Sequence, residues 1–283
     1  MDRSIFATEK VSEDEPPVGI VFTDVDGTLL DAEHRVIPEA CPVVQRVVEA
    51  GIPFVLVSAR MPEGLTTIQR EMGFTGPLVC YSGAYVLDED GRELLSRPIG
   101  LADALELKAF LDTDLPEICC SEYGFHTWAC DDDSDPRIKN EERITTLKAM
   151  RAPLTEAFDE QGVHKFLLMG EPEQIEAAEL RVADEFPQLE VVRSSPILCE
   201  IMNGAASKAE GVQVVCEHFG LVPADAVAFG DGRNDIAMLD AVPRSYAMGN
   251  APDEVKRAAA RVCPWTNDEN GLARMLEELL RGC

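Results

Sequence analysis

The stretch IVFTDVDGT at residues 20–28 begins as an apolar, strand-forming run and ends in two aspartates, Asp24 and Asp26, followed by Gly27 and Thr28. Two carboxylates one residue apart repel each other, so their place at the end of a buried strand needs a compensating positive charge. In open parallel sheets, ligands bind beyond the carboxyl ends of the strands. The stretch therefore predicts a polar site at the end of the first strand of an α/β fold.

The residues that follow alternate between strand and helix patterns. We expect a helix at 38–50, a strand at 52–58, a helix at 62–72 and a strand at 77–81. With the first strand, this βαβαβ order predicts a parallel sheet covered by helices. The alternation returns late in the chain, with helices expected at 207–218, 234–241, 252–261 and 271–281, and strands at 226–229 and 245–248.

The middle of the chain has a different pattern, which starts near the DEDG turn at residues 88–91. We interpret residues 87–203 as an inserted α+β domain between two core segments, 1–86 and 204–283. Within the insert we expect helices near 101–111, 136–150 and 173–185, and strands at 164–169, 189–193 and 197–202.

Composition limits the class of protein and its partners. A chain of 283 residues with 46% hydrophobic content is long enough for two domains, because single cores rarely grow beyond ~250 residues. It carries 52 acidic and 25 basic residues, a formal net charge of −27, which would repel nucleic acid and anionic membranes. We expect neither as a partner, and an anionic substrate would need a local positive site.

Nothing in the sequence indicates secretion or membrane insertion. The first 19 residues are acidic, are interrupted by Pro16 and Pro17, and have no basic start or apolar run. No window approaches the ~20 apolar residues that a membrane span needs. The nine cysteines are scattered without a CxxC pair, and only Cys119 and Cys120 are adjacent. These features predict a cytoplasmic protein with reduced thiols.

Polar residues follow several of the expected core strands. Asp24 and Asp26 end the first strand, Ser58 ends the second, and Asp231 and Asp235 follow the strand before GDGRND. Four carboxylates that converge on one place would take up protons unless a cation lay among them. Oxygen ligands of this kind suit Mg²⁺, which shares its coordination shell with water and substrate phosphate. The sequence therefore predicts a magnesium site.

A carboxylate held in such a group can attack phosphorus. Asp24 is the candidate nucleophile, provided that the phosphoryl charge is neutralised from other sides. The Ser58 hydroxyl, the backbone amides of the Gly27 turn and the Lys208 ammonium group are candidates for that neutralisation. Asp26 would protonate the leaving alkoxide and later deprotonate water.

These residues lie in stretches that resemble a known family, the haloacid dehalogenase superfamily of phosphatases, and within it the Cof-type sugar-phosphatase branch with a type IIB cap. The four motifs are DVDGT at 24–28, VLVSAR at 55–60, ASKAEGV at 206–212 and GDGRND at 230–235, and the resemblance continues through AMGNAPDEVKRAAARV at 247–262 and TNDENGLA at 266–273.

The resemblance implies a Rossmann-like core split by a cap at 87–203, with Mg²⁺ as cofactor and a small phosphorylated metabolite, such as a sugar phosphate, as substrate. It implies Asp24 as nucleophile and metal ligand, and Asp26 as general acid and base and as a metal ligand through its backbone carbonyl. The other implied residues are Ser58 and Lys208 as phosphate ligands, Asp231 and Asp235 as metal ligands, and Gly27, Thr28 and Asn234 as contacts near the phosphate.

The chain departs from the family pattern in two places. Where the family often has TGR, this chain has Ser58, Ala59 and Arg60, so the hydroxyl is kept and Arg60 is a candidate phosphate or substrate contact. Where the family often has NGA, this chain has Ser82 before Gly83, so no substrate contact is carried over to that position.

Two alternatives use the same motifs. A phosphomutase shares the aspartyl-phosphate and the cap but must hold a bisphosphate, so it needs basic residues in the insert. A non-catalytic phospho-metabolite-binding or signalling protein would not need an acid–base group two residues after the nucleophile, and Asp26 argues against it. Basic candidates in the insert are Arg137, Lys139, Arg143, Lys148, Arg151, Lys165 and Arg193.

The run DDDSDPRIKNEE at 131–142 resembles a calcium loop in the spacing of its acids, but Pro136 occupies the position that requires glycine. We predict instead that Asp135 caps a helix that begins at Pro136. The four histidines show no metal-ligand spacing, and only His126, close to Tyr123 and Trp128, is a candidate substrate contact. The others are His34, His164 and His218.

Overall fold

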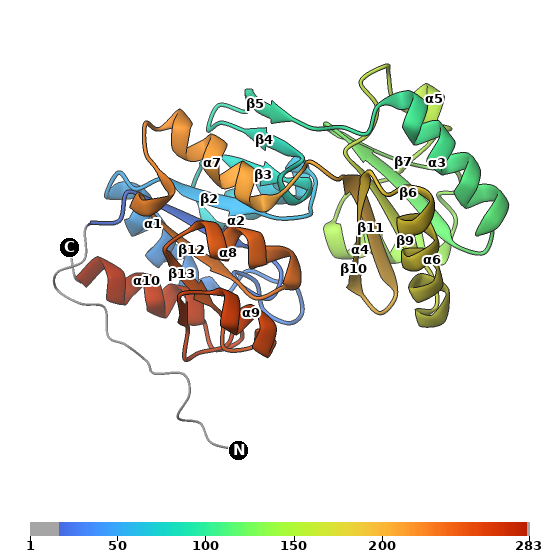
Figure 1. The fold of residues 1–283 in the computed structure, drawn as a ribbon. Helices are drawn as coiled ribbons and strands as arrows, with labels where there is room; N and C mark the ends of the chain where they lie inside the picture. Colours follow the sequence, from blue (N-terminus) through green and yellow to red (C-terminus); the bar gives the residue numbers. More distant parts are fainter. Residues whose placement is uncertain (1–16, 282–283) are drawn as a thin grey trace. The chain divides into compact units, whose positions relative to one another are not determined.

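The computed structural model describes residues 17–281, which form two compact units (Figure 1). The larger unit contains the described residues up to 59, residues 65–95 and those from 207 onward, and the smaller unit contains 60–64 and 96–206. The acidic N-terminal stretch lies almost entirely outside the described residues. Each unit is built on a sheet covered by helices, and the predicted α/β fold is confirmed.

The larger unit is built on an eight-stranded sheet in the order β14-β13-β12-β1-β2-β3-β4-β5. Its central strand β1 (Ile20–Asp24) is fully buried and pairs in parallel with β12 (Ala226–Gly230) and β2 (Phe54–Val57). The remaining strands are β3 (Leu78–Cys80), β4 (Tyr85–Leu87), β5 (Glu93–Ser96), β13 (Arg244–Ala247) and β14 (Arg261–Val262).

Helices cover both faces of this sheet. Ile20 and Phe22 of β1 face a core cluster with buried residues of α7 (Lys208–His218), α8 (Ile236–Ala241) and α9 (Asp253–Ala258). On the other face, α1 (Cys41–Glu49), which follows a short 3₁₀ turn, packs against α10 (Gly271–Arg281). Because strand side chains alternate between faces, a strand buried on both faces reads as a continuous apolar run, as β1 does. The helix after β2 is α2 (Pro62–Met72).

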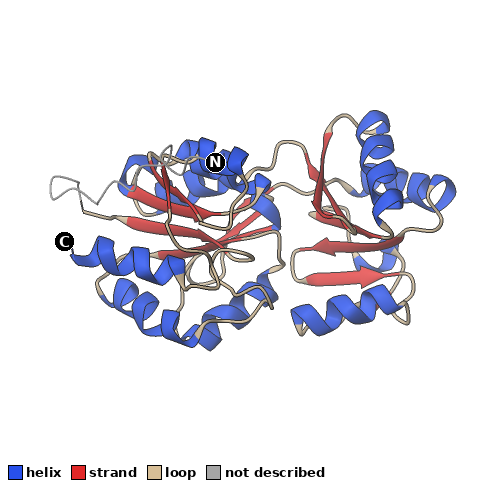
Figure 2. Ribbon diagram, turned by 90° about the horizontal axis from the view of Figure 1, so that it is seen from below, coloured by secondary structure: helices blue, strands red, loops and turns tan. Residues whose placement is uncertain are grey.

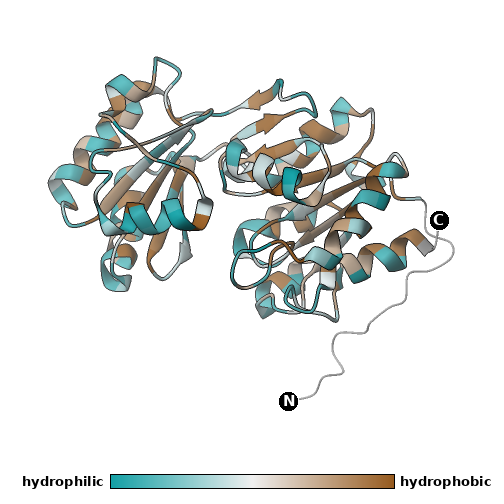
Figure 3. Cartoon of the chain, turned by 180° about the vertical axis from the view of Figure 1, so that it is seen from behind, coloured by the Kyte–Doolittle hydropathy of each residue, from teal (hydrophilic) through white to brown (hydrophobic). Residues whose placement is uncertain are grey.

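The smaller unit has a six-stranded sheet in the order β10-β11-β9-β6-β7-β8, antiparallel except for the last pair (Figure 2). Two long helices, α3 (Leu101–Asp114) and α6 (Pro172–Glu185), contribute buried apolar residues to the core on one face. The strands of the larger unit are mostly apolar, whereas those of the smaller unit mix polar and apolar residues (Figure 3). Remaining elements are β6 (Cys119–Gly124), β7 (Thr127–Cys130), α4 (Pro136–Thr145), β8 (Met150–Arg151), α5 (Leu154–Ala157), β9 (Lys165–Met169), β10 (Leu189–Ser195) and β11 (Leu198–Asn203).

The structure differs from the sequence expectations in three local features. The chain leaves the larger unit at 95/96 rather than 86/87, because β4, the turn at Asp88 and β5 extend the larger sheet. The helix expected at 136–150 ends at Thr145, since Thr146 has the left-handed φ of 60° that ends helices. The β6–β7 hairpin was not expected at all.

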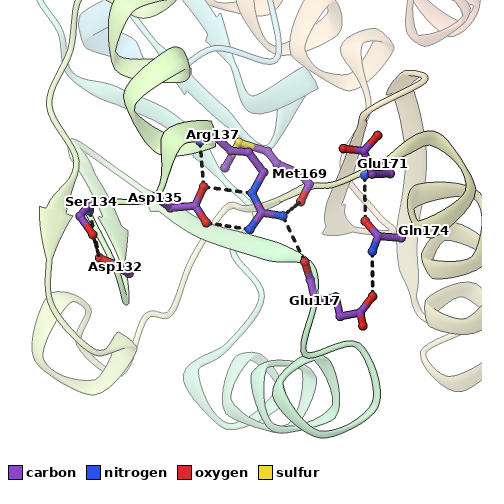
Figure 4. A network of polar contacts seen from close by, with 8 residues as sticks. All are labelled: Glu117, Asp132, Ser134, Asp135, Arg137, Met169, Glu171 and Gln174. Carbon is purple, nitrogen blue, oxygen red and sulfur yellow. Dashed lines mark hydrogen bonds and ion pairs between the residues drawn. The ribbon is translucent and has the colours of Figure 1, made fainter.

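The acidic run at 131–142 is a helix start, as predicted (Figure 4). Asp135 accepts a hydrogen bond from the backbone N–H of Arg137 at 2.8 Å and binds its guanidinium with both carboxylate oxygens. The same guanidinium donates to the backbone carbonyls of Glu117 and Met169. This pairing holds the pKa of Asp135 below its ordinary value. Asp135 is therefore committed to capping α4 and to tying it to the sheet.

None of the eight cysteines within the described residues forms a disulfide bond. Between residues 17 and 281, the chain has no helix with the length and apolar character needed to cross a membrane.

Candidate active site

The carboxyl edge of the larger sheet gathers polar residues from neighbouring strands. Asp24 ends β1, Ser58 follows β2, and Asp231 follows β12. The parallel register places Asp24 opposite Val57 and Thr23 opposite Phe229, so the three polar positions share one edge. This is the edge at which open α/β sheets bind ligands.

Lys208 lies at the centre of this group. Its Nζ atom is 2.6 Å from Oδ1 of Asp24 and 2.5 Å from Oδ1 of Asp235. Asp24 is 6% exposed, Lys208 1% and Asp235 0%. Lys208 is the first residue of α7, and the helix is capped by Ser207, whose hydroxyl accepts from the Glu210 N–H at 3.1 Å. This N-cap hydrogen bond fixes where α7 starts and therefore the direction of the Lys208 side chain.

Asp235 is held on both oxygens. Its Oδ2 atom accepts from the N–H groups of Asp231 (2.9 Å) and Gly232 (2.8 Å), while Oδ1 receives Lys208. Through these contacts Asp235 orders the GDGRND loop, and it also belongs to the set of carboxylates that could bind an ion. Asn234, in the same turn, is exposed.

Asp231 is oriented by residues of the first motif and by one residue that the sequence analysis gave no role. Thr28 Oγ1 donates to Oδ1 of Asp231 at 3.0 Å, and Asn250 Nδ2 donates to Oδ2 at 3.1 Å and to the Gly27 carbonyl at 2.8 Å. Gly27 has φ of +84°, and a Cβ atom there would lie 2.4 Å from Oδ2 of Asp231. Only glycine allows this close approach.

Ser58 is 2% exposed and is joined to the turn after β3. Its carbonyl accepts from the Ser82 N–H at 2.9 Å. Tyr81, Ser82 and Gly83 all have positive φ, and a Cβ atom on Gly83 would lie 2.0 Å from the carbonyl oxygen of Ser207. This turn therefore brings the Ser58 segment against the start of the Lys208 helix.

Three carboxylates in this group could hold a metal ion. Asp24, Asp231 and Asp235 offer oxygens that lie within 4.8 Å of one another, whereas the Asp26 carboxylate is not part of this set. Burial and the neighbouring Asp235 raise the pKa of Asp24 well above its ordinary value, although Lys208 opposes the shift. The same two causes raise the pKa of Asp231 to about 6. A buried oxygen cluster with more negative than positive charge fits a hard divalent cation.

Lys208 remains charged in this setting. Burial alone would lower its pKa, but Asp235 and Asp24 outweigh burial and hold the pKa above its ordinary value. One lysine between two aspartates leaves the group with a net negative charge, which a cation or bound protons must balance.

One candidate residue, Asp26, lies apart from the buried carboxylates. The Asp26 side chain is 35% exposed, and its Oδ1 atom is 2.7 Å from Nδ1 of His34, a contact that no local sequence pattern indicated. Arg60 lies in the segment 60–64, which groups with the smaller unit, and its contact with phosphate or substrate stays a prediction.

A helix-covered parallel sheet with a buried Asp–Lys–Asp group at its carboxyl edge can bind an anionic ligand together with a divalent cation. A family profile described as haloacid dehalogenase-like hydrolase matches residues 21–276. The chain belongs to this family.

Known relatives agree with this assignment. A Haemophilus influenzae protein named "Putative phosphatase" is 34% identical over 91% of this chain and 97% of its own length. A glucosyl-3-phosphoglycerate/mannosyl-3-phosphoglycerate phosphatase of Persephonella marina is 25% identical over 93% and 99%. The crystal structure of a haloacid dehalogenase-like hydrolase from Bacteroides thetaiotaomicron shares the fold, with a TM-score of 0.84 and 24% identity over 93% of this chain and 99% of that one. The enzyme class is therefore phosphatase.

Proposed function

We propose that this enzyme is a Mg²⁺-dependent phosphomonoesterase that acts on small phosphorylated metabolites, sugar phosphates in particular, through an aspartyl-phosphate on Asp24. The observation that carries the proposal is Lys208 between Asp24 and Asp235, with Asp231 beside them. The named activity of the Persephonella relative, a phosphatase for two sugar-bearing phosphoglycerates, supports a small phosphorylated metabolite that contains a sugar.

In the first step an oxygen of Asp24 attacks phosphorus, and the bond from phosphorus to the substrate's alkoxy oxygen breaks. Asp26 gives its proton to that oxygen, so the leaving group departs as an alcohol. In the second step water attacks the same phosphorus, its proton passes to Asp26, and the bond to Asp24 breaks. Asp26 suits this role because it is more exposed than Asp24 and lies outside the lysine-bound group.

The buried group supplies charge for this reaction. Lys208 and the Ser58 hydroxyl would bind phosphate oxygens, with the Gly27–Thr28 turn and Asn234 close to the phosphate. Asp24, Asp231 and the backbone carbonyl of Asp26, with Asp235 behind them, would hold Mg²⁺. When bound, the ion neutralises part of the phosphoryl charge and keeps Asp24 ionised.

We assign substrate selection to the smaller unit as a cap, with Arg60 and His126 as candidate contacts. Its basic side chains argue for hydrolase rather than mutase, because several are already paired with acids of the same unit. Arg137 binds Asp135, Lys139 and Lys148 both bind Glu142, and Arg193 lies 3.3 Å from Glu179. Each of these four side chains would have to leave its carboxylate partner before it could bind a second phosphate group.

The test is phosphate release from a panel of phosphorylated metabolites, measured against Mg²⁺ concentration for the parent, Asp24→Asn and Asp231→Asn. Asp24→Asn loses the attacking oxygen, so no Mg²⁺ concentration should restore turnover. Asp231→Asn keeps the nucleophile, so part of the rate should return toward tens of mM Mg²⁺, as ~2–3 kcal/mol of lost affinity implies. Rescue of Asp24→Asn by the ion would refute the proposed nucleophile.

A further inference from the structure

The first motif is followed by a histidine that reaches back to it. His34 Nδ1 lies 2.7 Å from Oδ1 of Asp26, eight residues earlier in the chain. We propose that His34 is a positioning residue that orients the Asp26 carboxylate for proton transfer to the leaving group. The inference rests on the acid–base role proposed for Asp26.

The turn that carries His34 is built to present it. Asp31 Oδ1 accepts from the N–H groups of Glu33 (3.0 Å) and Arg35 (2.8 Å), and the His34 N–H donates to the Asp31 carbonyl at 3.0 Å. Leu30 and Val36 form an antiparallel bridge that closes the turn. The imidazole therefore comes from an ordered turn with defined ends.

His34 has a left-handed backbone conformation, with φ of +60°. Glycine adopts this conformation without cost, and histidine, like asparagine, is among the side chains that are found in it most often. The turn would form more readily with glycine, yet it carries an imidazole that contacts the candidate acid.

The turn is held in place from a second part of the chain. Ala32 N–H donates to Oδ1 of Asp268 at 2.8 Å, and Asn267 Nδ2 donates to the Leu30 carbonyl at 2.9 Å. Asn267 is buried and its own N–H donates to Oδ1 of Asn250, which also contacts Asp231. His34 is thus fixed relative to the acidic group by a continuous set of hydrogen bonds.

A bond from Nδ1–H to one carboxylate oxygen restricts rotation of the Asp26 side chain, so the carboxyl group is held in one orientation for proton transfer. The hydrogen bond needs only a hydrogen on Nδ1, which both the neutral ring and the charged ring can supply. The effect is therefore one of orientation, and it should matter only when the leaving group needs a proton.

The test compares two substrates in three variants. p-Nitrophenyl phosphate loses a leaving group that needs no proton, whereas an alkyl phosphate that the parent hydrolyses, such as glycerol phosphate, needs one. His34→Gly and His34→Asn both tolerate φ of +60°, but only asparagine keeps a side-chain N–H near the Nδ1 position. Asp26→Asn is the reference for loss of the acid, and kcat/KM isolates the first chemical step.

We expect His34→Gly to lower kcat/KM roughly 10-fold for the alkyl ester and less than about 2-fold for the aryl ester, a fraction of what general acid catalysis supplies. His34→Asn should recover most of the loss. Equal losses on both substrates, or no recovery in His34→Asn, would overturn the positioning role. If Asp26→Asn itself treats both substrates alike, the acid assignment of the proposed function fails, and this inference with it.

Discussion

The Nζ atom of Lys208 lies 2.6 Å from Oδ1 of Asp24, although the two residues are 184 positions apart in the sequence. The lysine side chain is fully buried and also binds Asp235, so one positive charge is shared by two buried carboxylates. Breaking a buried ion pair by removing one partner is far more costly than losing a surface pair. The site therefore contributes to the stability of the larger unit as well as to its chemistry.

Replacing Lys208 by methionine should abolish activity and destabilise the metal-free protein by about 3–5 kcal/mol, because two buried carboxylates lose their counter-charge. Added Mg²⁺ should raise the melting temperature of Lys208→Met more than that of the parent. Thermal melts with EDTA and with Mg²⁺ measure both effects. Lys256→Met is the control, since Lys256 Nζ donates to a backbone carbonyl, that of Gly249. Equal losses in the two variants would contradict the counter-charge role.

Metal binding should release protons from the acidic group. The pKa of Asp231 is raised to about 6 and that of Asp24 is raised as well, so near pH 6 the metal-free site holds protons that a cation displaces. The apparent Mg²⁺ affinity should rise from pH 5 to pH 7. Calorimetric titrations in two buffers of different ionisation enthalpy count the released protons. An affinity that does not change between pH 5 and pH 7 would speak against Asp231 as a ligand.

Glu122 should make the stability of the smaller unit fall as pH rises. Burial raises the pKa of Glu122 to about 7 from an ordinary 4.5, although Lys108 opposes the shift. Between these values the folded chain keeps a proton that the unfolded chain has released, so the free energy of unfolding declines with increasing pH. Glu122→Gln removes this decline and should be more stable than the parent at pH 8, by up to about 3 kcal/mol, but not at pH 5.

The measurement is urea unfolding at both pH values, followed by the fluorescence of Trp128 in a Trp265→Phe background. The chain has two tryptophans, and only Trp128 belongs to the smaller unit. Glu190→Gln, an exposed change in the same unit, serves as the control and should shift little at either pH. A stability gain in Glu122→Gln that is the same at pH 5 and pH 8 would exclude the proton-linked explanation.

Gly83→Ala should be far more damaging than Gly91→Ala. Both glycines have positive φ, which costs an alanine ~1–2 kcal/mol, but only Gly83 meets a neighbour, the Ser207 carbonyl at 2.0 Å from an added Cβ atom. An alanine at position 83 therefore forces the backbone at Ser207 and Lys208 to move. We expect Gly83→Ala to lose at least ~3 kcal/mol and most activity, and Gly91→Ala to keep its activity. Urea unfolding and phosphate release on the two variants decide the point.

The sequence predicted β1, β2 and β12 well because each is an apolar run that ends at a polar residue, Asp24, Ser58 or Asp231. It missed the β6–β7 hairpin, because its turn at Phe125 and His126 lacks the usual glycine or asparagine, and Phe125 itself takes a positive φ. The Tyr123–Trp128 pair, stacked across the hairpin, was the available signal.

Long-range contacts of the site were beyond sequence reasoning. Asn250 contacts the Gly27 carbonyl across 223 positions, and no periodicity links the two residues. His34 shows no metal-ligand spacing, so the sequence indicates no role for it, whereas its contact depends on the left-handed turn that returns it to Asp26. Motif spacing predicts which residues lie at the ends of strands. It does not predict which other side chains a turn brings into contact with them.

The pairing of β1 with β12 also sets an order of events during synthesis on the ribosome. β1 ends in Asp24 but keeps one edge open until residues 226–230 emerge, on the order of ten seconds or more after the first strand at normal translation rates. Lys208 leaves the ribosome before Asp231 and Asp235, so we expect the carboxylates never to assemble without their lysine. Limited proteolysis of a chain stalled just after residue 206 has left the ribosome should cleave the unfinished larger sheet and spare residues 96–206. Protection of residues 17–95 would contradict this order.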